Sequence, residues 1–194
     1  MKTPRFISAG PLLASVLLSL LPLHLTGAPA KEEVLIDFTY VTVDHTTGEK
    51  TKSYEFAWDD WGKHITDLPG KGCLVQSPTN KGVLGENRTM VKFDKTTTID
   101  LVFIIGNANN AKVINFYLED SDGTVQTWSI PLEELTKGRQ YRVPIDLTKC
   151  TAEEKPGKKP GMNFKKIATW QIKGDWSEPN IEVLLIKVVA PKAP

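Results

Sequence analysis

The chain has 194 residues, of which 40% are hydrophobic and 24% are charged, with 24 Lys and Arg against 23 Asp and Glu. This composition is typical of a globular protein and excludes collagen-like, coiled-coil and wholly disordered chains. The formal net charge of +1 gives no overall field that attracts nucleic acid or acidic lipid. We therefore expect no nucleic-acid partner.

Residues 1–30 have the pattern of a secretory signal peptide. Lys2 and Arg5 precede a long apolar segment, and small residues run up to a cleavage site at Ala30. The alternative is an uncleaved membrane anchor, because about twenty apolar residues can just span a bilayer. We expect residues 31–194 to form a single domain that is secreted or periplasmic and has no membrane partner after cleavage.

Beyond the leader, the dominant hydrophobic period is two. Ile99, Leu101 and Phe103 alternate with residues that face the other way, and such alternation predicts strands that are buried on one face. Alternation or enrichment in Val, Ile, Thr and aromatic residues predicts strands at 34–43, 52–57, 89–94, 99–105, 112–118, 124–130, 141–147, 167–173 and 181–189. The segment 131–137 reads as a short helical turn.

Glycine-containing turn signals separate these strands. They include Asp122-Gly123 and Lys137-Gly138, as well as Pro-Gly pairs at positions 156–157 and 160–161. Many short strands joined by such turns, with no long helical segment, are typical of two-layer all-β proteins. We therefore predict an all-β fold, an antiparallel β-sandwich of the jelly-roll type.

Four runs of residues follow the order strand, acidic hairpin, strand, short turn and strand. They are FYLEDSDGT at 116–124, WSIPL at 128–132, YRVPIDL at 141–147 and IATWQIKG at 167–174. This arrangement resembles galactose-binding-like β-sandwich modules, which include many carbohydrate-binding modules and the complex I intermediate-associated family. The resemblance implies a jelly roll that binds ligands at loops on one edge or on a concave sheet face, often with a structural calcium.

The five tryptophans fall into two groups. Trp128 and Trp170 share their strand faces with apolar residues, so we predict that both lie in the core. The other three lie in polar, turn-prone segments, where an indole can stack on a pyranose while nearby carboxylates bind its hydroxyls. We predict a ligand-binding rim made of Trp58, Asp59, Asp60, Trp61 and Trp176. The alternative is that one or two of these rings cover the end of the sandwich.

Cys73 and Cys150 both lie in the part of the chain that we expect to be exported. Thiols in an oxidising compartment tend to pair, so we predict a Cys73–Cys150 disulfide, with two free thiols as the alternative. His45 and His64 lack the spacing of a zinc site. Asn87 begins a glycosylation sequon, which is meaningful only in a host that has the machinery.

A structural calcium is implied by the resemblance. Calcium takes six to eight oxygen ligands, and Asp37, Asp44 and Asp146 are the candidate contributors near strand ends. The run that starts at Asp120 begins like an EF-hand loop, but Pro131 occupies the position of the final Glu. We interpret that run as a turn, and we expect no cofactor other than the calcium.

Motifs of known catalytic sites are missing from the sequence, including G-x-S-x-G and H-E-x-x-H. A glycosidase needs two carboxylates across one bond, and the acids available are Asp59, Asp60, Glu119, Asp120 and Asp122. Adjacent acids on hairpins usually set turns. We therefore expect an exported, non-catalytic module that binds a glycan or another cell-surface ligand. The alternatives are a structural or protein-interaction protein of the cell envelope and, third, a small glycoside hydrolase.

Overall fold

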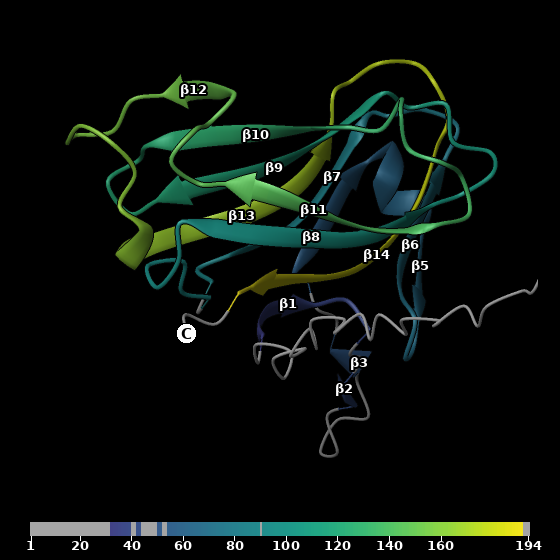
Figure 1. Ribbon diagram of the computed structural model, residues 1–194, viewed down its shortest axis with the longest axis horizontal. Helices are drawn as coiled ribbons and strands as arrows, with labels where there is room; N and C mark the ends of the chain where they lie inside the picture. The colour runs from purple at the N-terminus through teal and green to yellow at the C-terminus, as the bar shows by residue number, and fades with distance from the viewer. Residues whose placement is uncertain (1–31, 40–41, 44–49, 52–53, 90, 192–194) are drawn as a thin grey trace, which may run out of the picture.

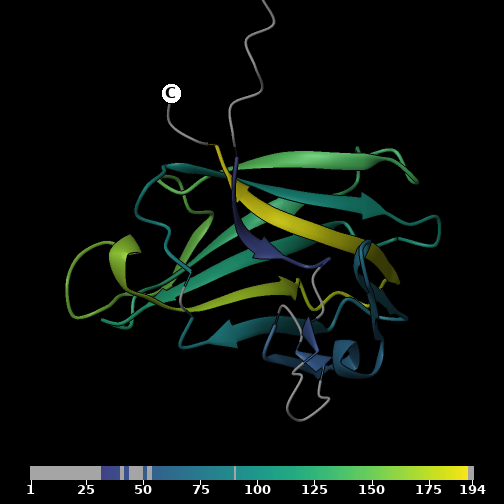
Figure 2. The same ribbon diagram turned by 90° about the horizontal axis from the view of Figure 1, so that it is seen from below.

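The computed structural model describes residues 32–39, 42–43, 50–51, 54–89 and 91–191. The fold consists of two antiparallel sheets of six strands each. The sheets pack face to face, as Figures 1 and 2 show. Within the described residues, helical structure is limited to two short 3-10 helices, η1 (Asp60–Lys63) and η2 (Phe164–Lys166). The prediction of an all-β sandwich is confirmed.

One sheet, which we call the β8 sheet, has the strand order β11-β8-β14-β6-β5. The first half of β14 pairs with β6, and its second half pairs with β1. The strands of this sheet are β1 (Glu33–Asp37), β5 (Ile65–Leu68), β6 (Gly72–Ser77), β8 (Thr98–Ile105), β11 (Gln140–Asp146) and β14 (Ile181–Ala190).

The second sheet, which we call the β9 sheet, has the strand order β12-β10-β9-β13-β7-β4. Its strands are β4 (Phe56–Asp59), β7 (Gly82–Asn87), β9 (Val113–Asp120), β10 (Val125–Pro131), β12 (Ala152–Lys155) and β13 (Ile167–Gly174). A separate hairpin pairs β2 (Thr42–Val43) with β3 (Lys50–Thr51).

The core lies between the two sheets and contains the two tryptophans that the alternation placed there. Trp170 is 0% exposed and Trp128 is 3% exposed, so both predictions are confirmed. Each indole N–H also has a partner: Trp170 Nε1 donates to Glu86 at 2.8 Å, and Trp128 Nε1 donates to the carbonyl of Asp146 at 2.9 Å. Burial of these rings therefore leaves no indole donor unsatisfied.

Several elements differ from the sequence-based prediction. Residues 91–94, part of a predicted strand at 89–94, lie outside the strands. The segment 131–137 forms no helix but a turn, in which Leu135 N donates to Leu132 O at 3.1 Å. The strands β3, β5, β6, β7 and β12 were not predicted.

The strand β7 escapes prediction because two glycines interrupt its pattern. A Cβ atom at Gly82 would lie 2.0 Å from Cγ of Trp61, and one at Gly85 would lie 2.4 Å from the carbonyl oxygen of Trp170. A side chain at either position would therefore clash with a neighbouring residue. From sequence alone they read as turn residues.

The predicted disulfide is wrong, because the structure contains no bond between Cys73 and Cys150. Cys73 lies in β6 and Cys150 follows β11, and β14 and β8 separate these two strands in the β8 sheet.

The predicted signal peptide at 1–30 lies outside the described residues. Among the residues that the structure describes, none of the helices is long and apolar enough to cross a bilayer.

Candidate ligand-binding face

The side chains of the β9 sheet that point away from the core form its outer face. On β9, Phe116 and Leu118 face the core, so the residues next to them face outward. The register then aligns two outer rows across five strands. The first row is Phe56, Gly85, Gln171, Tyr117 and Thr127, and the second is Trp58, Val83, Lys173, Asn115 and Ser129.

Trp58 lies at the β4 edge of this outer face. Its ring stacks on that of Phe56 with the centroids 4.2 Å apart and an interplanar angle of 18°. The indole nevertheless remains 55% exposed, whereas Phe56 is buried. Phe56 therefore supports one side of an indole whose remaining surface faces solvent. Trp58 therefore lies at the surface, and its role in a ligand-binding rim stays a prediction.

Trp61 lies in the core, so its assignment to the rim is wrong. It is 1% exposed. The chain turns at Asp59, which has a φ of 56°, and enters the 3-10 helix η1. This turn directs Trp61 inward onto Gly82 rather than outward beside Trp58.

Asp60 and the loop of Trp176 lie at the same end of the β9 sheet. Asp60 accepts a hydrogen bond from Thr79 Oγ1 at 2.5 Å, so its carboxylate holds the turn between β6 and β7. Asn80 and Lys81, the next two residues of that turn, contact the loop that follows β13. Asn80 Nδ2 donates to Asp175 at 2.8 Å, and Lys81 forms an ion pair with Glu178.

Trp176 lies in the middle of this loop. It is 49% exposed, and its φ of 62° is unusual for a residue with a side chain. Burial alone would raise the pKa of Asp175, but hydrogen bonds from Ser177 and Asn80 outweigh burial and lower it. The ionised carboxylate therefore fixes the loop that presents Trp176. The structure thus places Trp58, Asp59 and Trp176 at the same end of the β9 sheet. Trp61 is not part of this group, because it lies in the core.

A polar cluster occupies the centre of the outer face. The Lys173 ammonium lies 4.6 Å from the Tyr117 ring centroid and 2.7 Å from Oε1 of Glu154 on β12. The same carboxylate oxygen accepts a hydrogen bond from Thr127 at 2.6 Å. Tyr117 donates to Glu119 at 3.2 Å.

The ionisation of this cluster follows from its contacts. Burial, and then the negative charge of Glu119, raise the pKa of the Tyr117 hydroxyl. Burial also acts to raise the pKa of Glu154, but hydrogen bonds from Lys173 and Thr127 lower it overall. At neutral pH the centre of the face therefore presents a neutral phenol and an ionised carboxylate.

The sequence prediction missed these central residues. Alternation along β9 and β13 places Tyr117 and Lys173 on faces opposite to their apolar neighbours. Glu154 carried no such signal, since β12 has four exposed residues, AEEK, and no apolar alternation.

The candidate calcium ligands are not brought together. Asp37 lies at the end of β1, where it accepts hydrogen bonds from Thr39. Asp146 ends β11 and accepts hydrogen bonds from Thr148, and β14 and β8 separate the two strands. Asp44 lies outside the described residues. Among the residues described, no three His, Cys, Asp or Glu side chains form a group that could hold a metal, and the calcium stays a prediction.

Asp120 has a structural role in the hairpin between β9 and β10. Its carboxylate is 2% exposed and accepts hydrogen bonds from the backbone N–H groups of Asp122, Thr124 and Asn163 at 2.8–2.9 Å. The interpretation of this run as a turn is confirmed.

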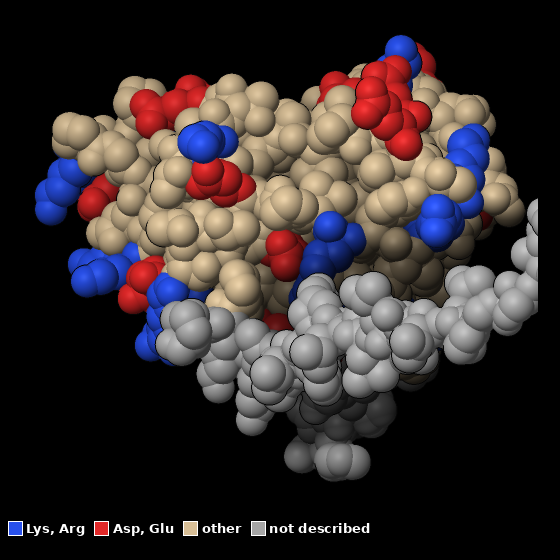
Figure 3. Space-filling view, viewed as in Figure 1, with Lys and Arg blue, Asp and Glu red and all other residues tan. Residues whose placement is uncertain are grey.

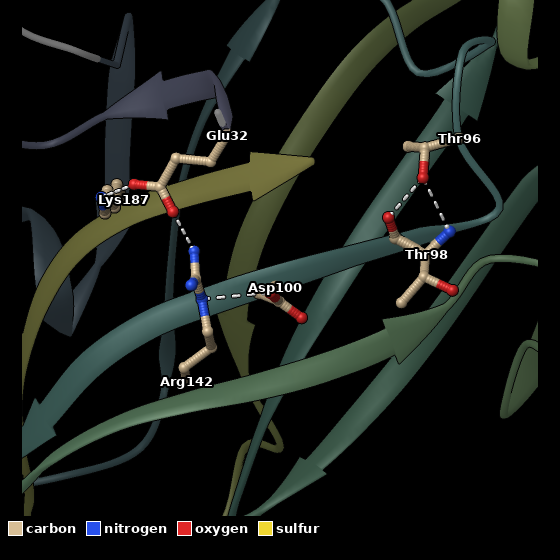
Figure 4. A network of polar contacts seen from close by, with 6 residues as sticks. All are labelled: Glu32, Thr96, Thr98, Asp100, Arg142 and Lys187. Carbon is tan, nitrogen blue, oxygen red and sulfur yellow. Dashed lines mark hydrogen bonds and ion pairs between the residues drawn. The ribbon is translucent and has the colours of Figure 1, made fainter. Parts of the chain in front are cut away.

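The outer face of the β8 sheet has a different chemistry. Glu32 forms ion pairs with Lys187 and Arg142, and Arg142 also contacts Asp100 at 3.1 Å (Figure 4). In the view of Figure 3, acidic and basic side chains lie interspersed rather than gathered into a patch of one sign. The charges of this network pair with one another.

The sequence matches no protein-family profile and no curated protein. The structure is similar to the family 11 carbohydrate-binding module of a cellulosomal cellulase of Clostridium thermocellum, with a TM-score of 0.52 and 14% identity over 86% of this chain and 97% of that module. It is also similar to part of an agarase, with a TM-score of 0.53 and 10% identity over 83% of this chain and 26% of the agarase. The chain therefore has the jelly-roll β-sandwich fold of carbohydrate-binding modules, as the resemblance implied.

Proposed function

We propose that this protein is a non-catalytic carbohydrate-binding module whose glycan lies on the outer face of the β9 sheet. The observation that carries the proposal is the Trp58 indole, which is 55% exposed although it is stacked on Phe56. An exposed, supported indole on a sheet face is suited to stack on the apolar C–H face of a pyranose. The fold shared with a carbohydrate-binding module supports this proposal.

The rest of the face supplies the polar contacts that a sugar needs. Gln171 contributes an amide to the first outer row, and Ser129 contributes an exposed hydroxyl to the second. The rows cross five strands from β4 to β10, which is about 19 Å at about 4.8 Å per strand. We therefore expect an extended chain of several sugar residues that runs across the strands.

Three of the five candidate catalytic acids make structural hydrogen bonds, which supports a binding role rather than a hydrolytic one. Asp60 holds Thr79, and Asp120 accepts three backbone N–H groups in a hairpin. Glu119 accepts the hydroxyl of Tyr117. These three carboxylates are thus occupied by structural hydrogen bonds. With the leader predicted at residues 1–30, we propose that the module acts outside the cytoplasm, as a secreted or periplasmic protein.

The test is binding of the purified protein to polysaccharides, by affinity electrophoresis, followed by titration calorimetry with cello- and agaro-oligosaccharides. Trp58→Ala should weaken binding about tenfold, since a stacked aromatic contributes on the order of 1 to 2 kcal/mol. Val34→Ala is the matched control, because Val34 is 45% exposed but lies on the β8 sheet. If the wild type binds no glycan, or if Trp58→Ala binds as well as Val34→Ala, the proposal fails.

An alternative uses the same exposed indoles. Trp58 and Trp176 are exposed large aromatics, and tryptophan is enriched at hot spots of protein interfaces. A protein that assembles with an envelope partner would bind that partner through these rings and would show no saturable binding to polysaccharides. The electrophoresis separates the two functions.

A further inference from the structure

The most unusual contact on the proposed glycan-binding face is made by Lys173. Its side chain starts on β13, passes over the ring of Tyr117 on β9, and ends at Glu154 on β12. The ammonium is 4.6 Å from the ring centroid, and the side chain is 16% exposed. An exposed lysine normally extends into solvent, whereas this one lies across a neighbouring strand.

Lys173 takes the position that a sugar needs in order to stack on Tyr117. The ring belongs to the first outer row, between Gln171 and Thr127, so it lies in the path of a chain that runs from Trp58 toward β10. A cation above the ring is held there by the electron-rich face and by the carboxylate of Glu154. A pyranose and the ammonium cannot occupy that face together.

Glu154, which pairs with Lys173, lies on the short edge strand β12. β12 has four residues, all exposed, and pairs on one side with β10 through an irregular register. Glu154 is 42% exposed, so solvent and salt reach the carboxylate end of the ion pair, whereas the Lys173 side chain is 16% exposed. Such a contact can open at modest cost.

We propose that Tyr117 is a second stacking platform for the glycan and that Lys173, held by Glu154, covers it in the unliganded protein. The inference rests on the proposed glycan-binding function and adds to it a closed pyranose subsite. A bound chain must displace Lys173, so part of the stacking free energy is used to open the ion pair.

The experiment is a double-mutant cycle at Lys173 and Tyr117, read as the affinity for the cello- or agaro-oligosaccharide that the wild type binds. Lys173→Ala uncovers the ring and should tighten binding about tenfold. Tyr117→Leu should weaken the Lys173→Ala variant by about the same factor but weaken the wild type by less. Unequal effects of one substitution in two backgrounds measure the coupling directly.

Salt dependence gives a readout that a merely structural role would not change. Raising the ionic strength weakens the Lys173–Glu154 pair, so the wild type should bind a neutral oligosaccharide more tightly in high salt. Glu154→Gln should bind more tightly than the wild type in low salt and show a flatter salt dependence. Lys149→Ala is the control, because it breaks an exposed ion pair with Asp146 on the other sheet.

Circular dichroism and melting temperatures establish that each variant is folded. If Lys173→Ala does not fold, Glu154→Gln replaces it as the variant that uncovers the ring. Equal or weaker binding by both variants overturns the covered subsite, while a loss in Trp58→Ala still upholds glycan binding. If neither the wild type nor these variants bind any glycan, the proposed function and the subsite both fail.

Discussion

Both faces of the β9 sheet carry aromatic residues, but the environments of these residues differ. On the inner face, Trp170 and Trp128 are buried and each indole N–H has a partner. On the outer face, Trp58 is exposed on a ring that supports it, and Tyr117 lies beneath a lysine. Because successive residues of a strand point to opposite sides, a shift of one position separates a buried aromatic from one that we propose to contact the glycan. The comparison shows that strand parity decides which of these rings are buried in the core.

The largest effect should come from the inner face. Trp170→Ala removes a ring that is 0% exposed and should lower the free energy of unfolding by about 3 to 5 kcal/mol. Trp58→Ala, on the outer face, should cost less than about 1 kcal/mol while it weakens glycan binding. Urea unfolding followed by circular dichroism measures both. The comparison between the two faces breaks down if Trp58→Ala proves as destabilising as Trp170→Ala.

A slightly smaller effect is expected at Trp61, three residues beyond Trp58. Trp61→Ala should also destabilise the fold, by about 3 kcal/mol, because the ring is 1% exposed. Trp61→Phe should cost less than Trp170→Phe. In the described structure Nε1 of Trp61 is buried without a hydrogen-bond partner, whereas Nε1 of Trp170 donates to Glu86. If the Trp61→Ala variant is as stable as the wild type, the assignment of Trp61 to the core is wrong.

The sequence predicted the fold class and the inner face well, because alternation survives in the long strands β8, β9, β13 and β14. It failed at β7, where Gly82 and Gly85 make room for tryptophan contacts that no local pattern reveals. It also failed at Trp61, because the direction of the ring depends on a positive φ at Asp59, where glycine is the residue expected. The polar centre of the outer face depends on the pairing of β12 with β10, and such a long-range pairing leaves no trace in the local composition.

An intermediate effect on stability is expected at Asp120, the last residue of β9, whose side chain points to the inner face of the sheet. Asp120→Asn replaces one oxygen of a carboxylate that accepts three backbone N–H groups, and this leaves at least one buried donor facing an amide NH₂. The free energy of unfolding should fall by about 1 to 3 kcal/mol. Glu119→Gln, one residue earlier and on the outer face, is the matched control and should change stability much less. Equal losses in thermal unfolding would contradict the assignment of the two faces.

The smallest effect is expected on the outer face of the other sheet, at Glu32 in the network of Figure 4. Hydrogen bonds from Lys187 and then Arg142 hold the pKa of this carboxyl below its ordinary value. A carboxyl whose pKa is lower in the folded state stabilises the fold above its unfolded pKa, and this contribution is lost as the pH falls through the folded value. Because the network is solvent-accessible, Glu32→Gln should cost about 0.5 kcal/mol at pH 7. Urea unfolding of the wild type and the variant between pH 7 and pH 3 should show that gap closing as the pH falls, with glycan affinity at pH 7 unchanged. A gap that persists at pH 3 would mean that Glu32 acts through packing rather than charge, and a loss of glycan affinity would place part of the binding surface on the β8 sheet.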